Sequence, residues 1–467
     1  MQLVSIVLMP LYTDKLSTAE YGVLQTLYRV GDVLNICLMM NGIRQASLNF
    51  WCSAKDEQQQ ARIPATVGLF TLCVIAIGIL VAFATSGFLT SFFLKGMSPL
   101  LLACGTTAIL FQASTMMPLA LMQARLESVS YIIATVAILV MQLSLTIIGV
   151  AVLEWGVWGV VAAFAGTYGV MGIVLTAREL LRADLKPDMG QFWQIVKFAA
   201  PFVPAGLCFF VLHSGDHFFL VKYFGAGVAG VYGLGYKLGK GVVLLAFQPL
   251  AQVWGAWMYR MVKNDDANEV FGQMYTRIIA ACVWVGLTLL VFQDEVLALL
   301  SDPKFAGSAK VIAPLVFAHF FLVLNNLLDS AYYVKRRTDL KPWVALVGTV
   351  VMLVCYYALI PQYEEMGAAW ATLIGFAFLA TFNAAVAHQV LPVRFEWHRV
   401  AALLMLALGI FFASVPLNLG VGNFFIKLLL WGAFPTVVWL FLANGQERET
   451  IANALTKCTA LIRTYKT

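Results

Sequence analysis

The sequence predicts an all-α polytopic membrane protein with about 14 transmembrane helices, arranged as two parallel six-helix lobes around a central cavity and followed by two C-terminal helices. The first observation is composition. Hydrophobic residues make up 61% of the 467-residue chain and charged residues only 12%, whereas soluble domains contain about 25% charged residues. The other two observations are the long charge-free segments along the chain and the recurrence of unusual residues at a constant offset of 211 positions.

The charge-free windows set the expected helices, because a helix needs about 17 to 25 apolar residues to cross a bilayer and lipid leaves the backbone no other hydrogen-bonded form. The longest windows are 63–94, 96–124, 128–153, 155–177, 241–259, 343–363, 366–393, 400–426 and 428–446. Shorter or more polar windows are 22–40, 198–221, 278–293 and 311–334, and an apolar start covers 1–11.

The offset of 211 indicates two copies of one unit. It superposes Tyr12 on Tyr223, Tyr21-Gly22 on Tyr232-Gly233, Arg125 on Arg336, Met141 on Met352 and Glu154-x-Gly156 on Glu365-x-Gly367. An even number of helices per copy relates the two by an axis along the membrane normal. We expect an N-terminal lobe over 1–185, a C-terminal lobe over 186–392, two extra helices over 393–445 and an amphipathic cytoplasmic tail over 446–467.

The first helix looks truncated under this repeat. The stretch 1–11 spans only about 17 Å, against a hydrocarbon core about 30 Å thick. The offset would extend it upstream, so we expect roughly 13 or more additional apolar residues in the natural protein, preceded by Lys or Arg.

Lys and Arg accumulate on the cytoplasmic side of membrane proteins, and most of the 30 in this chain fall on one set of alternate helix ends. This bias predicts cytoplasmic termini, and it explains the net charge of +6 without a nucleic-acid partner. The eight cysteines are scattered and contain no C-x-x-C pair. We therefore expect neither disulfides nor a metal or other cofactor.

Several motifs resemble lipid-linked oligosaccharide flippases (O-antigen and polysaccharide) of the multidrug/oligosaccharidyl-lipid/polysaccharide exporter superfamily. The resemblance covers essentially the whole chain. It departs from the family at His217, where relatives often carry Arg after the Asp. The motifs are Pro10-Leu11-Tyr12-Thr13, Leu16-Ser17, Glu20-Tyr21-Gly22, Asp216-His217-Phe218-Phe219-Leu220, Gly230-Val231-Tyr232-Gly233, Tyr236-Lys237, Ile360-Pro361-x-Tyr363 and Gly367-Ala368-Ala369-Trp370-Ala371-Thr372.

The resemblance implies a bacterial inner-membrane transporter, not an enzyme, that flips a polyprenyl-pyrophosphate-linked glycan by alternating access for lipopolysaccharide or other surface polysaccharide synthesis. Its partners would be membrane lipids, glycosyltransferases, a polymerase, and a coupling proton or sodium ion. Two alternatives stay open. A drug or cation antiporter would need carboxylates in its cavity, and a membrane-embedded polymerase or ligase would need a large outer loop; the intrahelical charges are mostly basic and the predicted outer loops are short.

A pyrophosphate cargo calls for cations inside helices, where charged residues normally face a cavity. Arg29, Lys237 and Lys240 are such cations, and Arg29 falls on Lys240 under the repeat. We predict that they bind the pyrophosphate and face each other across the cavity. Alternatively, Arg29 only pairs with Asp32, and Lys240 extends its amine to a membrane interface.

The remaining polar residues of the helices each allow a structural interpretation. Asp216, His217, Asp32 and Asp329 belong either to an ion-coupling site or to contacts between lobes, and a protonated His217 would replace the Arg of relatives. Asn325, Asn326 and Tyr236 line the cavity or, for the asparagines, join helices by hydrogen bonds. His213 and His319 are expected in the interior. Glu154 and Glu365 are expected to cap short turns.

Overall fold

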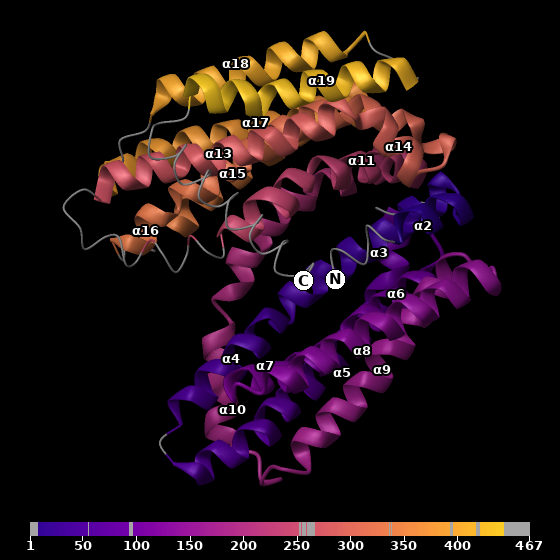
Figure 1. Ribbon diagram of the computed structural model, residues 1–467. Helices are drawn as coiled ribbons and strands as arrows, with labels where there is room; N and C mark the ends of the chain where they lie inside the picture. The colour runs from indigo at the N-terminus through magenta and orange to yellow at the C-terminus, as the bar shows by residue number, and fades with distance from the viewer. Residues whose placement is uncertain are drawn as a thin grey trace, which may run out of the picture. The chain divides into compact units, whose positions relative to one another are not determined.

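The computed structural model describes residues 8–54, 56–92, 97–251, 254, 258, 267–335, 337, 339–392, 396–416 and 421–442. These residues are almost entirely helical, and they contain no strand (Figure 1). The predicted amphipathic tail 446–467, residues 1–7 of the short first helix, and Arg336 of the repeat lie outside the described part of the chain.

Nine helices in the described part are long and apolar enough to cross a membrane, and 398–414 forms a shorter apolar helix. Two continuous helices are too long for one crossing. α11 (Phe202–Gly239) and α17 (Lys341–Val390) contain 38 and 50 residues, which correspond to about 57 and 75 Å. Each contains one residue with non-helical backbone angles, Gly225 in α11 and Glu364 in α17. α17 therefore provides two crossings, whereas the part of α11 after Gly225 is too short for a whole crossing and forms only the beginning of one.

By contacts the chain divides into two compact units. Unit 1 comprises 1–236, 297–314 and 339–379. It holds the first part of α11, most of α17, the start of α15 (Ala309–Leu328) and the following complete elements: α2 (Met9–Lys15), α3 (Thr18–Cys37), α4 (Met40–Ser53), α5 (Glu57–Phe92), α6 (Pro99–Leu110), α7 (Ala113–Ala124), α8 (Ser128–Ile147), η1 (Ile148–Val152), α9 (Val157–Leu180), α10 (Met189–Ala199) and the 3₁₀ helix η3 (Pro303–Ser308).

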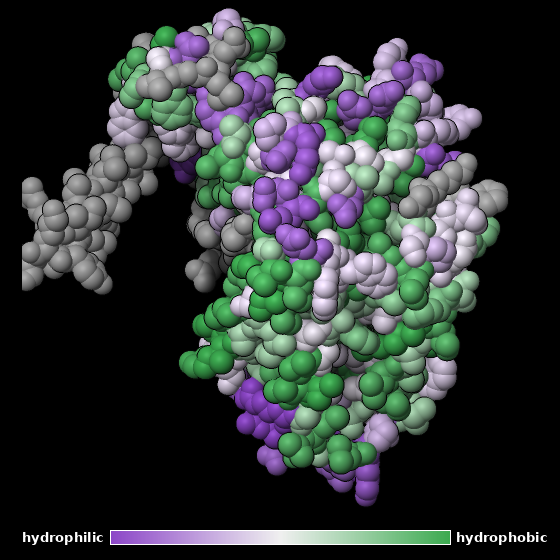
Figure 2. Space-filling model, turned by 90° about the vertical axis from the view of Figure 1, so that its right-hand side faces the viewer, coloured by the Kyte–Doolittle hydropathy of each residue, from purple (hydrophilic) through white to green (hydrophobic). Residues whose placement is uncertain are grey.

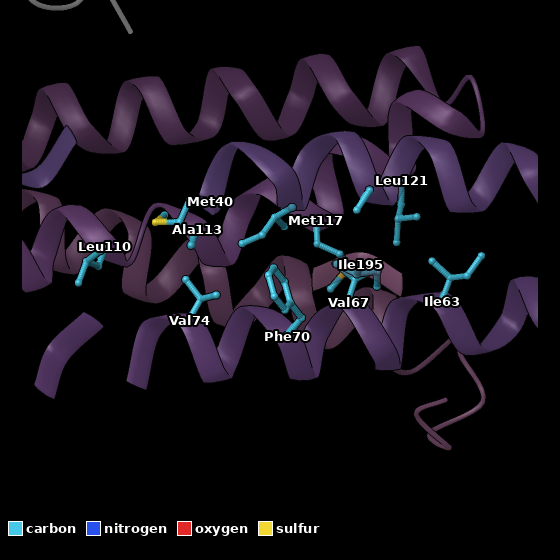
Figure 3. Close-up of a cluster of buried hydrophobic side chains, with 12 residues drawn as sticks. Met40, Ile63, Val67, Phe70, Val74, Leu110, Ala113, Met117, Leu121 and Ile195 are labelled. Atoms are coloured by element: carbon cyan, nitrogen blue, oxygen red, sulfur yellow. The ribbon is translucent and has the colours of Figure 1, made fainter. Parts of the chain in front are cut away.

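Unit 1 has a packed core where α4, α5, α7 and α10 meet (Figure 3). Met40, Val67, Phe70 and Met117 are among its buried side chains. The start of α3 is fixed by a capping box, in which Ser17 accepts from the Glu20 amide and the Glu20 carboxylate accepts from the Ser17 amide. Such reciprocal bonds satisfy amides that a helix start leaves unpaired.

Unit 2 comprises 237–296, 315–338 and 380–467. Two side chains of α19 contact helices of the second repeat. Lys427 Nζ lies 2.8 Å from Glu295 Oε1 of α14, and Trp431 donates to the Thr288 hydroxyl of α13. The elements of unit 2 are η2 (Val242–Phe247), α13 (Ala267–Val291), part of α14 (Gln293–Leu300), the end of α15, α16 (Ser330–Val334), the end of α17, α18 (Trp397–Ser414), α19 (Val421–Val437) and η4 (Val438–Leu442).

The predicted domain boundaries follow the sequence repeat, whereas the two units follow spatial contacts. The boundaries of the predicted lobes therefore remain a prediction. Unit 1 combines first-repeat helices with parts of the second repeat. The two repeats contain residues with the same unusual backbone conformation near one turn. Gly156 (φ 54°, ψ −130°) and Glu364 (φ 52°, ψ −131°) have the same backbone conformation.

Many apolar side chains of the predicted spans remain exposed, as expected for a lipid-facing surface. On α8, for example, Val129, Ile133 and Val140 are exposed, whereas Ala134, Ile138 and Gln142 are buried. Hydrophobic residues cover much of the molecular face shown in Figure 2, and hydrophilic residues gather in patches on it. The chain is thus a multi-pass membrane protein.

Candidate functional site

The backbones of α3 and α11 approach each other closely within unit 1. A Cβ atom added to Gly22 would lie 1.7 Å from the carbonyl oxygen of Ala226, and one added to Gly230 would lie 2.3 Å from that of Thr18. Only glycine fits at such a distance, and small residues allow membrane helices to pack this closely. This crossing joins a first-repeat helix to the second-repeat segment that begins after Gly225.

Asp216 lies beside this crossing, and both of its carboxylate oxygens accept hydrogen bonds. Oδ1 accepts from the His217 amide at 2.8 Å, and Oδ2 accepts from the Tyr232 hydroxyl at 2.5 Å. The Thr372 hydroxyl lies 3.5 Å from Oδ2 but is closer, at 2.9 Å, to the Ala368 carbonyl oxygen, to which it donates. Because Asp216 is only 2% exposed, the His217 amide and the Tyr232 hydroxyl are the donors that make a carboxylate tolerable there.

His217 links the same cluster to α3. Its Nε2 lies 2.9 Å from the Thr26 hydroxyl, which itself donates to the carbonyl oxygen of Gly22. The hydroxyl proton is therefore used, and the imidazole must donate through Nε2. We call Thr26, Asp216, His217, Tyr232 and Thr372 the Asp216 cluster. Its hydrogen bonds match the packing alternative for Asp216 and His217, and a role in ion coupling remains a prediction.

Arg29 lies one turn beyond Thr26 on α3. Its ion pair with Asp32 is long, with 4.0 Å between Nη1 and Oδ2, and Asp32 is half exposed. The buried Nε of Arg29 has no hydrogen-bond partner among the described residues. Tyr236, a predicted cavity residue, is buried one turn from Tyr232, and their ring centroids are 6.0 Å apart.

The other predicted site residues belong to unit 2. Lys237 and Lys240 are half-buried, and both have interactions with other groups. Arg29 belongs to unit 1. That Lys237 and Lys240 face Arg29 across a cavity therefore remains a prediction. Asn325 and Asp329 both accept from Asn383 Nδ2, at 2.9 and 3.1 Å. Their bonds match the interhelical alternative, whereas Asn326 is half-buried and its role stays open.

The residues that sequence reasoning missed are neutral. Thr26, Tyr232, Thr372 and Asn383 supply most of the hydrogen bonds around the predicted charges. Tyr232 and Thr372 occur in the sequence only as repeat or family-motif positions, without a predicted role in the site. A buried hydroxyl or amide in an apolar helix is a weak signal, but the positions of Thr26 and Asn383 inside expected helices were visible.

Comparison with known proteins supports a family assignment. Residues 16–302, more than half of the chain, match the model of a family described as polysaccharide biosynthesis protein. An uncharacterized membrane protein of Methanocaldococcus jannaschii is 23% identical over 156 residues, which cover 33% of this chain and 29% of that protein. The chain thus spans less than a third of the length of this relative.

Solved structures share the fold. The lipid II flippase MurJ in an inward closed conformation has a TM-score of 0.72 at 11% identity, with 94% of this chain and 97% of that chain covered. An inward-facing multidrug resistance MATE family transporter of the MOP superfamily has a TM-score of 0.65 at 13% identity, with 86% and 95% covered. With the fold of these MOP proteins and the matched model, the chain belongs to the polysaccharide biosynthesis protein family.

Proposed function

We propose that the protein is a transporter that flips a polyprenyl-pyrophosphate-linked oligosaccharide across the bacterial cytoplasmic membrane by alternating access. Family membership and the fold shared with a lipid II flippase support transport of a lipid-linked glycan. In this proposal both termini are cytoplasmic. The glycan serves a surface polysaccharide such as lipopolysaccharide O-antigen, made with glycosyltransferases and a polymerase, and a proton or sodium gradient drives the cycle.

The observation that carries the proposal is the incomplete hydrogen bonding of the Arg29 guanidinium. A guanidinium within a membrane helix is costly unless a partner or cavity compensates it. Its Asp32 partner is 4.0 Å away and half exposed, and its buried Nε has no partner among the described residues. An anionic ligand such as a pyrophosphate would supply the missing acceptors, since guanidinium groups bind phosphates through paired hydrogen bonds.

The MATE likeness keeps a cation antiporter as the second candidate. Such a protein needs a carboxylate that is free to hold an organic cation. The Asp216 carboxylate is instead engaged by Tyr232 and the His217 amide, which favours the glycan carrier. A membrane-embedded polymerase or ligase has less support, since the fold is that of transporters.

The test is reconstituted flipping with proteoliposomes that contain lipid-linked glycan extracted from the source cells. We expect Arg29→Gln to lower the flipping rate roughly tenfold or more, because a charged hydrogen bond is lost, and Arg29→Lys to retain more activity. Arg62→Gln is the matched control, because Arg62 pairs with Asp184 at a partly exposed site. Wild-type vesicles that extrude ethidium but do not flip the glycan lipid would establish the antiporter instead.

A further inference from the structure

Unit 1 contains a cavity of about 730 Å³ between α4, α7, α8 and α9, within the range of about 300 to 1,000 Å³ typical of ligand pockets. Glutamines are unusually frequent in its wall: Gln45, Gln112, Gln123 and Gln142. Gln45 is exposed, whereas Gln142 and Tyr168 are buried. The cavity therefore leads from an exposed rim to a buried floor. We call it the glutamine cavity.

Helix α8 provides one wall of the glutamine cavity in a regular pattern. Tyr131, Thr135, Ile138 and Gln142 follow one another at spacings of four, three and four residues, which places them on one face of a helix. Residues on the opposite face, such as Ile133, are exposed. Helix α8 thus keeps an apolar face for lipid and turns its hydroxyl and amide groups inward.

Gln142 carries an unfilled hydrogen-bonding site at the buried end. It is 3% exposed, and its Nε2 donates to the Thr146 hydroxyl at 3.2 Å. Its Oε1 has no donor among the described residues. A buried amide oxygen without a donor is costly, and Gln142 lines the cavity. A ligand with hydroxyl groups would satisfy it.

The charged residues of the cavity wall indicate which class of ligand it can bind. Arg44 is the charged residue among those that line the cavity, and its Nη2 donates to Gln123 Oε1 at 3.1 Å. No carboxylate lines the described wall, so an organic cation finds no counter-charge. A diphosphate would find one arginine that is already engaged. Neutral amides and hydroxyls, which both donate and accept, suit a neutral polyol.

The apolar part of the wall fits the same ligand class. Met116, Leu119 and Ile138 line the cavity together with the Tyr131 and Tyr168 rings. Ligand sites commonly combine apolar and aromatic walls with a few polar groups that fix orientation. A sugar ring has both kinds of surface, since its hydroxyl edge can bond to amides and its C–H face can lie against a tyrosine.

We infer that the glutamine cavity binds sugar units of the lipid-linked glycan, with Gln142 bonding a hydroxyl at the buried end. This inference rests on the proposed function and adds a separate sugar-binding subsite to the cationic one at Arg29. The rim residue Arg44 lies on the predicted cytoplasmic side, so a glycan would enter the cavity from there. Gln142 here is a specificity residue for the glycan and not for the lipid phosphate.

The experiment compares two lipids on the purified full-length protein in nanodiscs. The probes are the lipid-linked glycan fraction of the source cells and sugar-free undecaprenyl pyrophosphate, with binding followed by intrinsic fluorescence. Gln142→Leu has a similar volume and removes a poorly satisfied buried amide, so folding is not at risk. Gln191→Leu is the matched control, because Gln191 is 5% exposed in α10 and does not line the cavity.

We expect Gln142→Leu to weaken binding of the glycan lipid roughly tenfold and to leave the sugar-free lipid unchanged, with no effect of Gln191→Leu. Equal affinity of wild type and Gln142→Leu for the glycan lipid would overturn the inference, as would equal losses for both lipids. Either of these results leaves the proposed function intact if wild type still flips the glycan. If the wild-type protein binds no glycan lipid at all, both the proposed function and this inference are rejected.

Discussion

The contact between α3 and α11 allows a quantitative test, because Gly22 lies directly against the backbone of Ala226. In a Gly22→Ala variant the new Cβ would be 1.7 Å from the Ala226 carbonyl oxygen. Carbon and oxygen atoms normally approach no closer than about 3.3 Å, so the helices must separate by roughly 1.6 Å. The bond between His217 Nε2 and Thr26, now 2.9 Å, would lengthen to about 4.5 Å if the helices moved along that line.

The free-energy cost of Gly22→Ala depends on what the new Cβ meets, which is the backbone carbonyl of Ala226. A backbone carbonyl cannot rotate aside as a side chain can, and overpacking costs about 1 to 3 kcal/mol. This free energy corresponds to a roughly 5- to 150-fold shift away from the packed state. Gly87→Ala is the matched control, since a Cβ added to Gly87 meets no atom within 4 Å.

Cysteine cross-linking measures the shift. In a cysteine-free background, Gln25→Cys and Gly233→Cys would report the contact, because a Cβ added to Gly233 lies 3.5 Å from Gln25 Cγ. We expect Gly22→Ala to slow disulfide formation at least fivefold and to impair flipping, while Gly87→Ala changes neither. Cross-linking at the control rate in Gly22→Ala, with unchanged thermal stability, would refute the reasoning about this crossing.

Three further predictions test other parts of the molecule. Lys427→Met should lower the stability of the protein in detergent by about 3 kcal/mol, because Lys427 is 2% exposed and pairs with Glu295; a second change, Glu295→Met, should recover most of the loss in melting temperature. Glu364→Gly should raise stability by about 1 kcal/mol, because Gly156 has the same backbone conformation without strain, and an unchanged melting temperature would argue against strain. If a protonated His217 replaces the Arg of relatives, reconstituted flipping should fall as pH rises in wild type and stay constant in His217→Arg; matching pH profiles would leave only the packing role.

The sequence predicted the helical membrane fold because bilayer thickness and backbone hydrogen bonding permit little else. The windows 343–363 and 366–393 correspond to the two parts of α17 on either side of Glu364. The charge-free window that starts at 241 follows a helix that resumes directly after Gly225 and ends at Gly239. Lys237 lies in this helix, as predicted, whereas Lys240 lies at the turn that follows it.

The candidate site was predictable mainly in its charged members and in a few neutral residues such as Asn325 and Tyr236. Arg29, Asp216 and His217 stand out in apolar helices, and the structure brings the last two into one cluster with Thr26. Neutral partners depend on how distant helices pack, which a single sequence does not specify. The spacing of Tyr131, Thr135 and Gln142 on α8 places three polar side chains on one helix face, but none of the three carries a charge that distinguishes a site from ordinary helix packing.

Asp216 and Gln142 differ in a way that separates structural from ligand-binding polar groups. Both are buried, and burial is costly for each without partners. Both oxygens of Asp216 are satisfied within the protein, so its removal should first weaken the contact between the two parts of α11 on either side of Gly225, which the bond to Tyr232 joins. The Oε1 of Gln142 lacks a donor among the described residues and lines a cavity, so its removal should first weaken ligand binding. Changes at Asp216 should therefore lower stability, and changes at Gln142 should alter glycan affinity while stability is maintained.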